Sequence, residues 1–395
     1  MIKIIIFAIF VFLAFKAITN IYKNPDSHFW DFKVYYFASK VLMSGGNPYT
    51  SGALSTAAGS EITLKYVYPP ATAFLFAPFT ALNFQNAAML FYIIKLIFFA
   101  GLFLIWFKYF DVDYKDPVFF LYAYFAFGSC IYIDLMTGNV SVFEQVLLWT
   151  GFAAFIKKKD WAFYGLITLV SFFKIVPLLF LLLPLIRKDR GAIKKILICF
   201  AAFAAYACLQ MLFMRGLFAD FIANAVSVDE RGAINPCSLA YFKDIAGSLS
   251  ARTGGVITPV FFWMPLYAIF ASGAVYLLLT KMKKEKIDGK ELIFAATLLY
   301  TIIAPRMKDY SYILIIPSVY YMFGNYSRNA TVFLLLLVSF NNTTIPYVRD
   351  KIWPSYSAYY PFFLATIIFF VWAASRVFTR VSSAQQQKAR SKQLP

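Results

Sequence analysis

The organisation of this chain is decided near its start, where residues 4–33 read IIIFAIFVFLAFKAITNIYKNPDSHFWDFK. The first part of this stretch, residues 4–22, is mostly apolar and has the length of a membrane-spanning helix, which needs roughly 20 residues. The polar part that follows places Asp31 at the water edge of the bilayer, among aromatic side chains and a histidine. Ionisable groups in such positions are costly to keep and are functional candidates. We therefore predict chemistry at a membrane surface, with Asp31 as its leading candidate.

The composition supports a membrane protein. Hydrophobic residues make up 61% of the 395 residues and aromatic residues 20%, well above the level of soluble domains. The net charge of +18 does not indicate nucleic acid, because the basic residues gather in short segments between apolar runs, as expected of cytoplasmic loops. The four cysteines show no disulfide or metal-site spacing. The first apolar run lacks a cleavage motif, which favours an uncleaved anchor.

Basic clusters assign the two sides of the membrane. Residues 157–159, 187–195, 281–290 and the tail from 376 are rich in lysine and arginine and are predicted to be cytoplasmic. Two large outer loops remain, residues 23–67 and 215–257, and the first is expected to carry an interfacial helix over residues 32–43. The sequence thus predicts an all-α multi-pass membrane protein with about 12 transmembrane helices. We assign residues 1–380 to one membrane domain and residues 381–395 to a disordered cytoplasmic tail.

Three apolar segments do not fit simple crossing helices. Residues 69–82 carry three prolines and are short for a span. Residues 160–186 form two short runs with Lys174 and Pro177 between them, and residues 291–323 form two more around Pro305. We predict re-entrant or broken helices here. Irregular backbone is tolerated at membrane depth only where it is buried in protein or lines a watery cavity.

The predicted topology gathers charged and polar side chains on the outer face. The set comprises Asp26, His28, Asp31, Tyr66, Tyr68, Lys174, Arg306, Lys308 and Asp309. Arginine and lysine bind phosphate through charge-assisted hydrogen bonds, and a carboxylate accepts a proton from an attacking hydroxyl. The set therefore suits a substrate that carries both a phosphate and a hydroxyl.

These residues also admit structural interpretations. Lys174 fits a lysine that reaches the membrane interface, and Arg306 and Lys308 fit loop charges, although the positive-inside rule disfavours a basic pair there. Asp31 fits a solvated loop acid. His28 fits an ordinary loop histidine better than a catalyst.

Other charged residues in or near apolar runs carry less functional weight. Asp134 and Glu144 are interpreted as helix caps. Lys95 lies within a predicted span and requires a partner that the sequence does not name. The triplet Asp111-Val-Asp113 matches a metal motif of soluble glycosyltransferases, but such triplets are common and this one is predicted to be cytoplasmic.

Several stretches resemble one family. Residues 31–49, DFKVYYFASKVLMSGGNPY, resemble the first-loop signature of the DUF2029-type mannosyltransferases, polyprenyl-phosphate-mannose-dependent enzymes of the GT-C superfamily of membrane glycosyltransferases. The further elements that match in order are Tyr66-Val-Tyr-Pro-Pro70, Lys174-Ile-Val-Pro177, Asn235-Pro-Cys-Ser238 and Pro305-Arg306 with Asp309. This chain departs from the family at Asn139, where glutamine is common, and at Tyr310, where histidine is frequent. The sugar and the acceptor are therefore open.

The resemblance implies a GT-C-like fold and an inverting transfer of a hexose, typically mannose, from a polyprenyl-phosphate donor to a lipid or glycan acceptor. It implies Asp31 as the general base and Lys174, Arg306 and Lys308 as ligands of the donor phosphate. The implied substrate pocket comprises Asp26, His28, Tyr35, Tyr66, Tyr68, Asn139, Asn235 and Asp309. No cofactor, metal or nucleic acid is expected, and membrane lipids are the surrounding partners.

The implied location is the plasma or inner membrane, with the active site facing the periplasm or exterior. A flippase or transporter of lipid-linked sugars and an enzyme like an O-antigen ligase or polymerase are the alternative functions. A flippase would share the broken helices and the charges at depth, but it would not need the long outer loops. A ligase would concentrate arginines in one outer loop, where this chain has mainly Arg215, Arg231 and Arg252.

Overall fold

The computed structural model describes residues 19, 23, 28–253, 258–285, 287–324, 328–339 and 354–374. All regular elements in these residues are helices, which confirms the predicted all-α class. The predicted first span, apart from Thr19, lies outside the described residues. Asp26 and the predicted tail also lie outside them.

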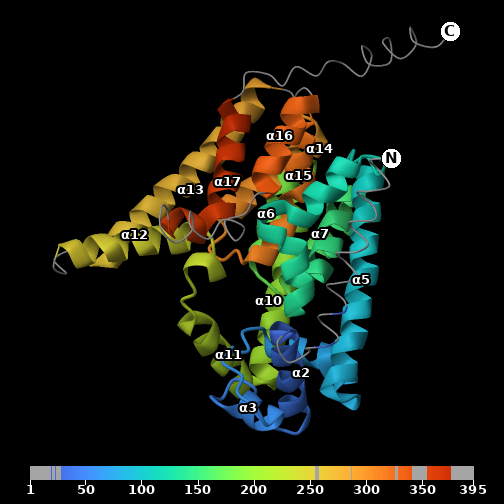
Figure 1. The fold of residues 1–395 in the computed structure, drawn as a ribbon, viewed down its shortest axis with the longest axis vertical. Helices are drawn as coiled ribbons and strands as arrows, with labels where there is room; N and C mark the ends of the chain where they lie inside the picture. Colours follow the sequence, from blue (N-terminus) through green and yellow to red (C-terminus); the bar gives the residue numbers. More distant parts are fainter. Residues whose placement is uncertain are drawn as a thin grey trace.

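The beginning of the described chain folds into a small helical layer at one end of the molecule (Figure 1). It contains α2 (Trp30–Met43), α3 (Ala53–Ala58), α4 (Pro70–Ala73) and the 3-10 helix η2 (Phe74–Ala81). Helix α2 confirms the helix predicted over residues 32–43. It ends just before Gly45, which takes a positive φ of 81°, a conformation that glycine adopts at little cost. Aromatic packing joins this layer to helix α5 (Phe84–Tyr109), because Phe32 stacks on Phe91 with ring centroids 4.4 Å apart.

The segment at residues 69–82 is broken, as predicted. A single turn of α-helix, α4, passes directly into η2, which contains Pro78. Proline has no N–H to donate and clashes with the preceding turn, so it disfavours a continuous α-helix here. The break keeps the segment at the end of the molecule, where it packs against α2.

Four helices of the described chain are long and apolar enough to cross a membrane: α5, α6 (Pro117–Thr137), α10 (Ala192–Phe213) and α13 (Pro259–Lys284). Shorter apolar helical stretches accompany them at Pro70–Ala81, Ser141–Ile156, Val176–Ile186, Asn329–Ser339 and Ala358–Ala374. Apolar helices of this length support a membrane protein. A span needs roughly 20 residues, and four helices of the described residues reach that length. The count of about 12 spans and the GT-C fold therefore stay predictions.

Helix α6 has an internal break that the sequence analysis did not anticipate. Three consecutive residues, Phe127, Gly128 and Ser129, have φ values of 49°, 79° and 63°, in the left-handed region that non-glycine residues rarely adopt. Phe127 is buried and stacks on Tyr312, with ring centroids 5.5 Å apart. The break is therefore partly covered by protein, with Phe127 buried and Gly128 and Ser129 partly exposed. Irregular backbone is tolerated in a membrane helix where it is buried in protein or lines a watery cavity.

The two predicted pairs of short runs are present. Helix α8 (Asp160–Ser171) is followed by a connection that contains Lys174, then by the 3-10 helix η3 (Val176–Leu182) and α9 (Leu183–Ile186). Helix α14 (Gly289–Ile303) is followed by the loop around Pro305, then by the 3-10 helix η5 (Asp309–Ile315) and α15 (Ile316–Phe323). The remaining helices of the bundle are α7 (Ser141–Ile156), α16 (Arg328–Ser339) and α17 (Pro354–Ala374).

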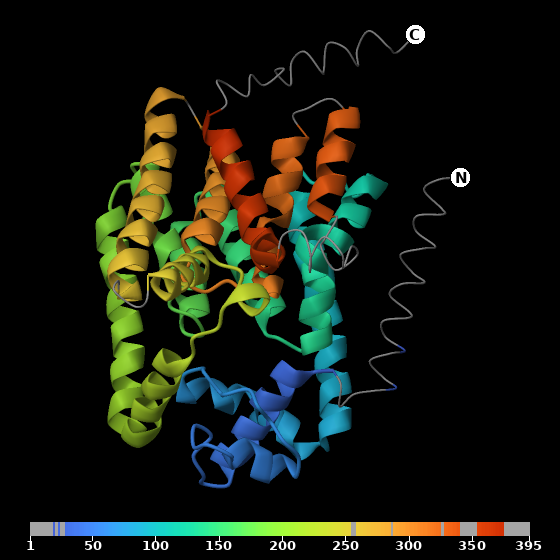
Figure 2. The same ribbon diagram turned by 60° about the vertical axis from the view of Figure 1, so that its left-hand side comes forward.

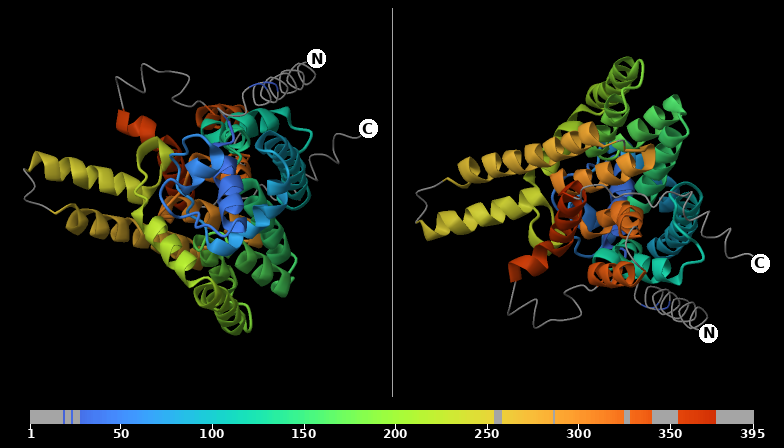
Figure 3. Two further views of the ribbon diagram at one scale, coloured as in Figure 1. Left: turned by 90° about the horizontal axis from the view of Figure 1, so that it is seen from below. Right: turned by 90° about the horizontal axis from the view of Figure 1, so that it is seen from above.

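The second predicted outer loop is largely helical. It contains α11 (Arg215–Ser227), the 3-10 helix η4 (Gly232–Ile234) and α12 (Ser238–Arg252). Helix α11 contacts α4 and lies at the same end of the molecule as α2 and α3 (Figure 2). Helix α12 packs along α13, and together they project sideways from the bundle (Figure 3).

A buried ion pair ties α5 to the end of α6. The Lys95 ammonium lies 2.8 Å from a carboxylate oxygen of Asp134, and both side chains are fully buried. The same ammonium donates to the backbone carbonyl of Asp134 and, at 2.6 Å, to that of Asn139. This is the partner of Lys95 that the sequence did not name. The interpretation of Asp134 as a helix cap is wrong, because its carboxylate faces the lysine across the bundle.

We predict that Lys95→Met destabilises the protein by about 3–5 kcal/mol, because it leaves the Asp134 carboxylate buried without its counter-ion. The double variant Lys95→Met/Asp134→Leu removes both charges and is expected to recover much of the loss. Thermal unfolding of the detergent-solubilised protein measures both. Lys290→Met is the control, since Lys290 and its ion-pair partner Asp111 are partly exposed and such pairs contribute about 1 kcal/mol or less. Equal losses in the single and double variants would contradict the prediction.

Candidate active site

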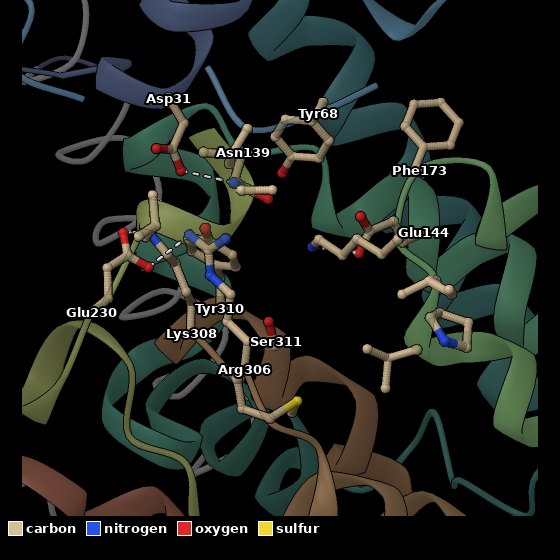
Figure 4. A pocket seen from close by; sticks show the side chains of 18 of the residues that line it. Asp31, Tyr68, Asn139, Glu144, Phe173, Glu230, Arg306, Lys308, Tyr310 and Ser311 are labelled. Atoms are coloured by element: carbon tan, nitrogen blue, oxygen red, sulfur yellow. Dashed lines mark hydrogen bonds and ion pairs between the residues drawn. The ribbon is translucent and has the colours of Figure 1, made fainter. Parts of the chain in front are cut away.

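A cavity of about 400 Å³ lies between the α2 layer and the bundle. Its walls come from α2, the segment before α4, the start of α7, the connection between α8 and η3, α11 and the loop before η5. Four basic and three acidic side chains line it together with tyrosines and amides (Figure 4). The polar lining residues are Asp31, Tyr35, Thr63, Lys65, Tyr68, Asn139, Glu144, Gln145, Lys174, Glu230, Tyr300, Arg306, Lys308, Tyr310 and Ser311.

Asp31 reaches the cavity from the first turn of α2 and is 8% exposed. One carboxylate oxygen accepts a hydrogen bond of 2.8 Å from the amide nitrogen of Asn139 (Figure 4). Burial raises the pKa of the Asp31 carboxyl above its ordinary value, while the Asn139 hydrogen bond and the positive charge of Lys308 oppose the rise. A carboxylate with a raised pKa is a stronger base than a solvated one, so it is better suited to accept a proton.

The orientation of the Asn139 amide is fixed by its neighbours. Its carbonyl oxygen accepts hydrogen bonds from the backbone N–H and the hydroxyl of Ser141, at 3.0 and 2.9 Å. Because a backbone N–H can only donate, the amide nitrogen must point the other way. It donates to Asp31 and, at 2.9 Å, to the hydroxyl of Tyr35. The Asn139 side chain is therefore a rigid link between the start of α7 and the Asp31 carboxylate.

Gly138 allows α2 to approach this link closely. Gly138 has a φ of 68°, and a Cβ atom there would lie 2.7 Å from the Cβ of Phe32 and 2.9 Å from the ring of Phe29. A hydrogen bond of 2.8 Å from the Phe29 N–H to the Met136 carbonyl joins the same two segments. Only glycine satisfies both the backbone conformation and the close approach. This contact sets the position of Asp31 relative to Asn139.

Two of the predicted cations, Arg306 and Lys308, share the carboxylate of Glu230. The distances are 2.7 Å from the Arg306 guanidinium and 2.8 Å from the Lys308 ammonium. The loop that carries them is held by Asn235, whose side-chain oxygen accepts from the Met307 N–H at 2.9 Å. Asn235 is buried behind this loop and is not part of the cavity lining. It positions the two cations rather than facing a ligand.

The third cation, Lys174, lies 2.9 Å from a carboxylate oxygen of Glu144. Burial opposes its charge, but the Glu144 carboxylate raises the pKa of Lys174 above its ordinary value. Lys174 therefore stays charged at neutral pH. Glu144 makes no helix-capping hydrogen bond at the start of α7, so its interpretation as a cap is wrong.

The structure brings most of the predicted site residues together, and it separates others. Asp31, Lys174, Arg306 and Lys308 all line the cavity, and Tyr35, Tyr68 and Asn139 line it with them. Tyr66 is buried outside the lining and bonds to Thr72 at 2.6 Å through its hydroxyl. His28, Asn235 and Asp309 also lie outside the lining.

Asp309 sits just behind the cationic loop, at the start of η5. Burial raises the pKa of its carboxyl to about 7, against the opposing charge of Lys308. It is therefore partly protonated at neutral pH. In the described part of the chain, no cluster of three or more histidine, cysteine or acidic side chains is suited to hold a metal ion.

Comparison with known protein families shows to which family the chain belongs. The family model of glycosyltransferase family 87 matches residues 66–305, more than half of the chain. The chain belongs to glycosyltransferase family 87. No curated protein and no solved structure gives a significant match. The match contains Asn139, Glu144, Lys174 and Glu230 and ends directly before Arg306, so most of the cavity wall lies within the region that defines this family of glycosyltransferases.

Three acidic or amide residues of this glycosyltransferase's cavity lining were not among the predicted site residues, namely Glu144, Gln145 and Glu230. Glu230 lies in an outer segment with several charges, and nothing local distinguishes it from its neighbour Asp229. Glu144 and Gln145 gave a clearer signal, because they are polar residues inside the apolar run 140–156 and polar side chains within such runs tend to face a cavity.

We predict that Asn139→Ala shifts the acidic limb of the pH–activity profile upward by about one pH unit, since a hydrogen bond to a charged group contributes about 1.5–3 kcal/mol. The reason is that Asn139 stabilises the charged form of Asp31, so its loss raises the Asp31 pKa further. Only the ionised carboxylate accepts a proton, so activity is lost as the pH falls through this pKa. The measurement is kcat/KM against pH. A lower maximum with an unshifted limb would contradict the assigned role of Asn139.

Proposed function

We propose that the protein transfers a hexose from a polyprenyl-phosphate donor to a hydroxyl of a lipid or glycan acceptor, with Asp31 as the general base. The observation that carries the proposal is that one cavity is lined both by a buried carboxylate, Asp31, and by Lys174, Arg306 and Lys308. Membership of a glycosyltransferase family supports the reaction type. The donor, the acceptor and the roles of the residues are proposals.

The proposed chemistry needs one proton acceptor and one site of fixed positive charge. The acceptor oxygen attacks the anomeric carbon, and its proton passes to Asp31. The bond between the anomeric carbon and the phosphate oxygen breaks, and the phosphate leaves with the bonding electrons. Attack opposite to the leaving group inverts the anomeric configuration. Preorganised cations stabilise the negative charge that develops on the departing phosphate.

The ion pairs around the cavity leave capacity for a phosphate. A guanidinium has five N–H donors and an ammonium three, and each of Arg306 and Lys308 makes one contact with Glu230. Glu230 therefore fixes the two cations while further donors on each are available to a ligand. The Arg306 fork suits two phosphate oxygens at once.

The apolar part of the lining supports a lipid-linked donor. Phe173 and Ile175 flank Lys174 on the connection between α8 and η3, and Val176 and Pro177 begin η3. Ile175 is 61% exposed and Leu179, on the next turn, is 45% exposed. This apolar rim next to a cation suits a molecule with a phosphate head and a hydrocarbon tail, because the tail gains free energy from leaving water.

The arrangement of the helices supports an active site on the outer face of the plasma or inner membrane. Helix α10 runs from the basic segment 187–195 to α11, which lies at the same end as α2 and α3 (Figure 2). The basic segment is expected on the cytoplasmic side, so the opposite end, which carries the cavity wall from α2 and α11, is proposed to face outward.

Turnover in liposomes tests the proposed function. Purified protein is reconstituted with a labelled polyprenyl-phosphate hexose and a lipid acceptor extract. Transfer of the label to the acceptor without net movement of the donor across the membrane is the expected result. Movement of the donor without transfer would instead identify a flippase.

We predict that Asp31→Asn lowers kcat by about 10²–10⁴-fold, the usual contribution of a general base, and leaves donor binding in place. The substitution keeps the shape of the side chain and its hydrogen-bonding site for Asn139 but removes its basicity. Asp111→Asn is the matched control, because Asp111 pairs with Lys290 outside the cavity. Near-normal turnover by Asp31→Asn would remove Asp31 from the mechanism.

We predict that Lys174→Ala and Arg306→Ala each lower kcat/KM by about tenfold or more, because each removes a charged hydrogen bond worth about 1.5–3 kcal/mol. Arg306→Lys is expected to restore part of the loss, since an ammonium cannot form a bidentate fork. Affinity for polyprenyl phosphate is compared with affinity for the polyprenol. Alanine variants that kept the wild-type preference for the phosphate would show that these cations are structural.

A further inference from the structure

The structure assigns Glu144 and Gln145 to a subsite for the hydroxyl groups of the transferred sugar. This inference rests on the proposed function and adds to it the side chains that recognise the sugar ring. The two residues are consecutive in the first turns of α7, and both line the cavity. They are 8% and 4% exposed, so both are almost completely buried.

Both side chains carry a buried oxygen that lacks a hydrogen-bond partner. One carboxylate oxygen of Glu144 is bound by Lys174, but within the described part of the chain the other oxygen has no partner. The side-chain oxygen of Gln145 likewise has none among the described residues. Buried polar atoms are nearly always satisfied, and leaving one unpaired is costly. Two neighbouring exceptions in the wall of one cavity point to a ligand that supplies the missing hydrogen bonds.

The chemistry of these atoms selects the part of the donor that binds there. Carboxylate and amide oxygens accept hydrogen bonds, so the ligand must donate them. The phosphate of such a donor is a diester without an O–H, so it cannot donate a hydrogen bond, and a hydrocarbon chain has no donors at all. Sugar hydroxyls donate to carboxylates through charge-assisted hydrogen bonds. The remaining part of a polyprenyl-phosphate sugar, its hexose ring, fits these requirements.

The position of the two residues suits a ring held between the base and the phosphate site. Figure 4 shows Glu144 across the cavity from Asp31 and Glu230, with Tyr68 on the wall between Asp31 and Glu144. Lys174 holds one oxygen of Glu144 in place and neutralises its charge. The cavity of about 400 Å³ lies within the range of small-molecule sites, which is roughly 300–1,000 Å³.

Binding measurements without an acceptor test the subsite. Purified protein in lipid nanodiscs is titrated with a polyprenyl-phosphate hexose and with bare polyprenyl phosphate, and the ratio of the two affinities is the readout. Wild type is expected to bind the sugar-bearing donor more tightly. Gln145→Leu and Glu144→Gln are each expected to reduce that ratio about fivefold or more, because each removes hydrogen bonds to the sugar. Gln145→Leu is expected to retain affinity for bare polyprenyl phosphate, whereas Glu144→Gln also changes the partner of Lys174 and is judged by the ratio alone.

A matched control is available. Gln210 is also buried, but its side-chain oxygen accepts from the Ala71 N–H at 2.9 Å and it lies outside the cavity lining. Gln210→Leu is expected to keep the wild-type ratio. Variants of Glu144 and Gln145 that kept the ratio, or that lost both ligands equally, would overturn the subsite and leave the proposed function intact. Failure of wild type to bind either ligand would overturn the proposed function itself.

Discussion

The candidate active site depends on one buried lysine. Lys95 binds the Asp134 carboxylate and the carbonyl oxygens on both sides of the turn between α6 and α7. That turn carries Asn139, which in turn holds the carboxylate of Asp31. A buried ion pair contributes little net stability, because the free energy of removing both charges from water offsets much of their attraction. Its value here is geometric, because a full charge in an apolar interior accepts few arrangements of its partners and so fixes the turn.

The three cations proposed to bind the donor phosphate are also paired with carboxylates. Lys174 is paired with Glu144, and Arg306 and Lys308 share Glu230. A protein that placed three cations in a partly buried cavity without carboxylates would have to overcome both their repulsion and their desolvation. Paired in this way, the cations are held in position before a ligand arrives. Preorganised charge of this kind stabilises a developing anion without the cost of reorientation at the moment of reaction.

The sequence predicted which residues line the cavity better than it predicted how they are paired. The all-α class, helix α2, the broken segment at 69–82 and the breaks near Lys174 and Pro305 followed from local signals such as proline position and apolar run length. The meeting of Asp31 with Lys174 and Arg306 followed from assigning loops to one side of a membrane. The pairs could not be predicted in this way, because each acid and its cation lie 30 to 78 residues apart and only the packing of the helices decides which ones meet. The internal break of α6 also escaped prediction, since no proline lies near it and Gly128-Ser129 lies within an apolar run.

Asn139 and Tyr310 are the two positions at which the sequence departs from the pattern expected from its resemblance. At position 139 the short asparagine side chain spans the distance from Ser141 to Asp31 with its amide orientation fixed. At position 310, where the resemblance leads us to expect histidine, burial and the neighbouring Asp31 charge raise the pKa of Tyr310 well above its ordinary value. A histidine changes its charge near pH 6.5, whereas Tyr310 stays a neutral O–H donor throughout the physiological range. The side chain at position 310 therefore adds no pH-dependent charge to the cavity, and the pH dependence predicted for the reaction rests on the Asp31 carboxyl.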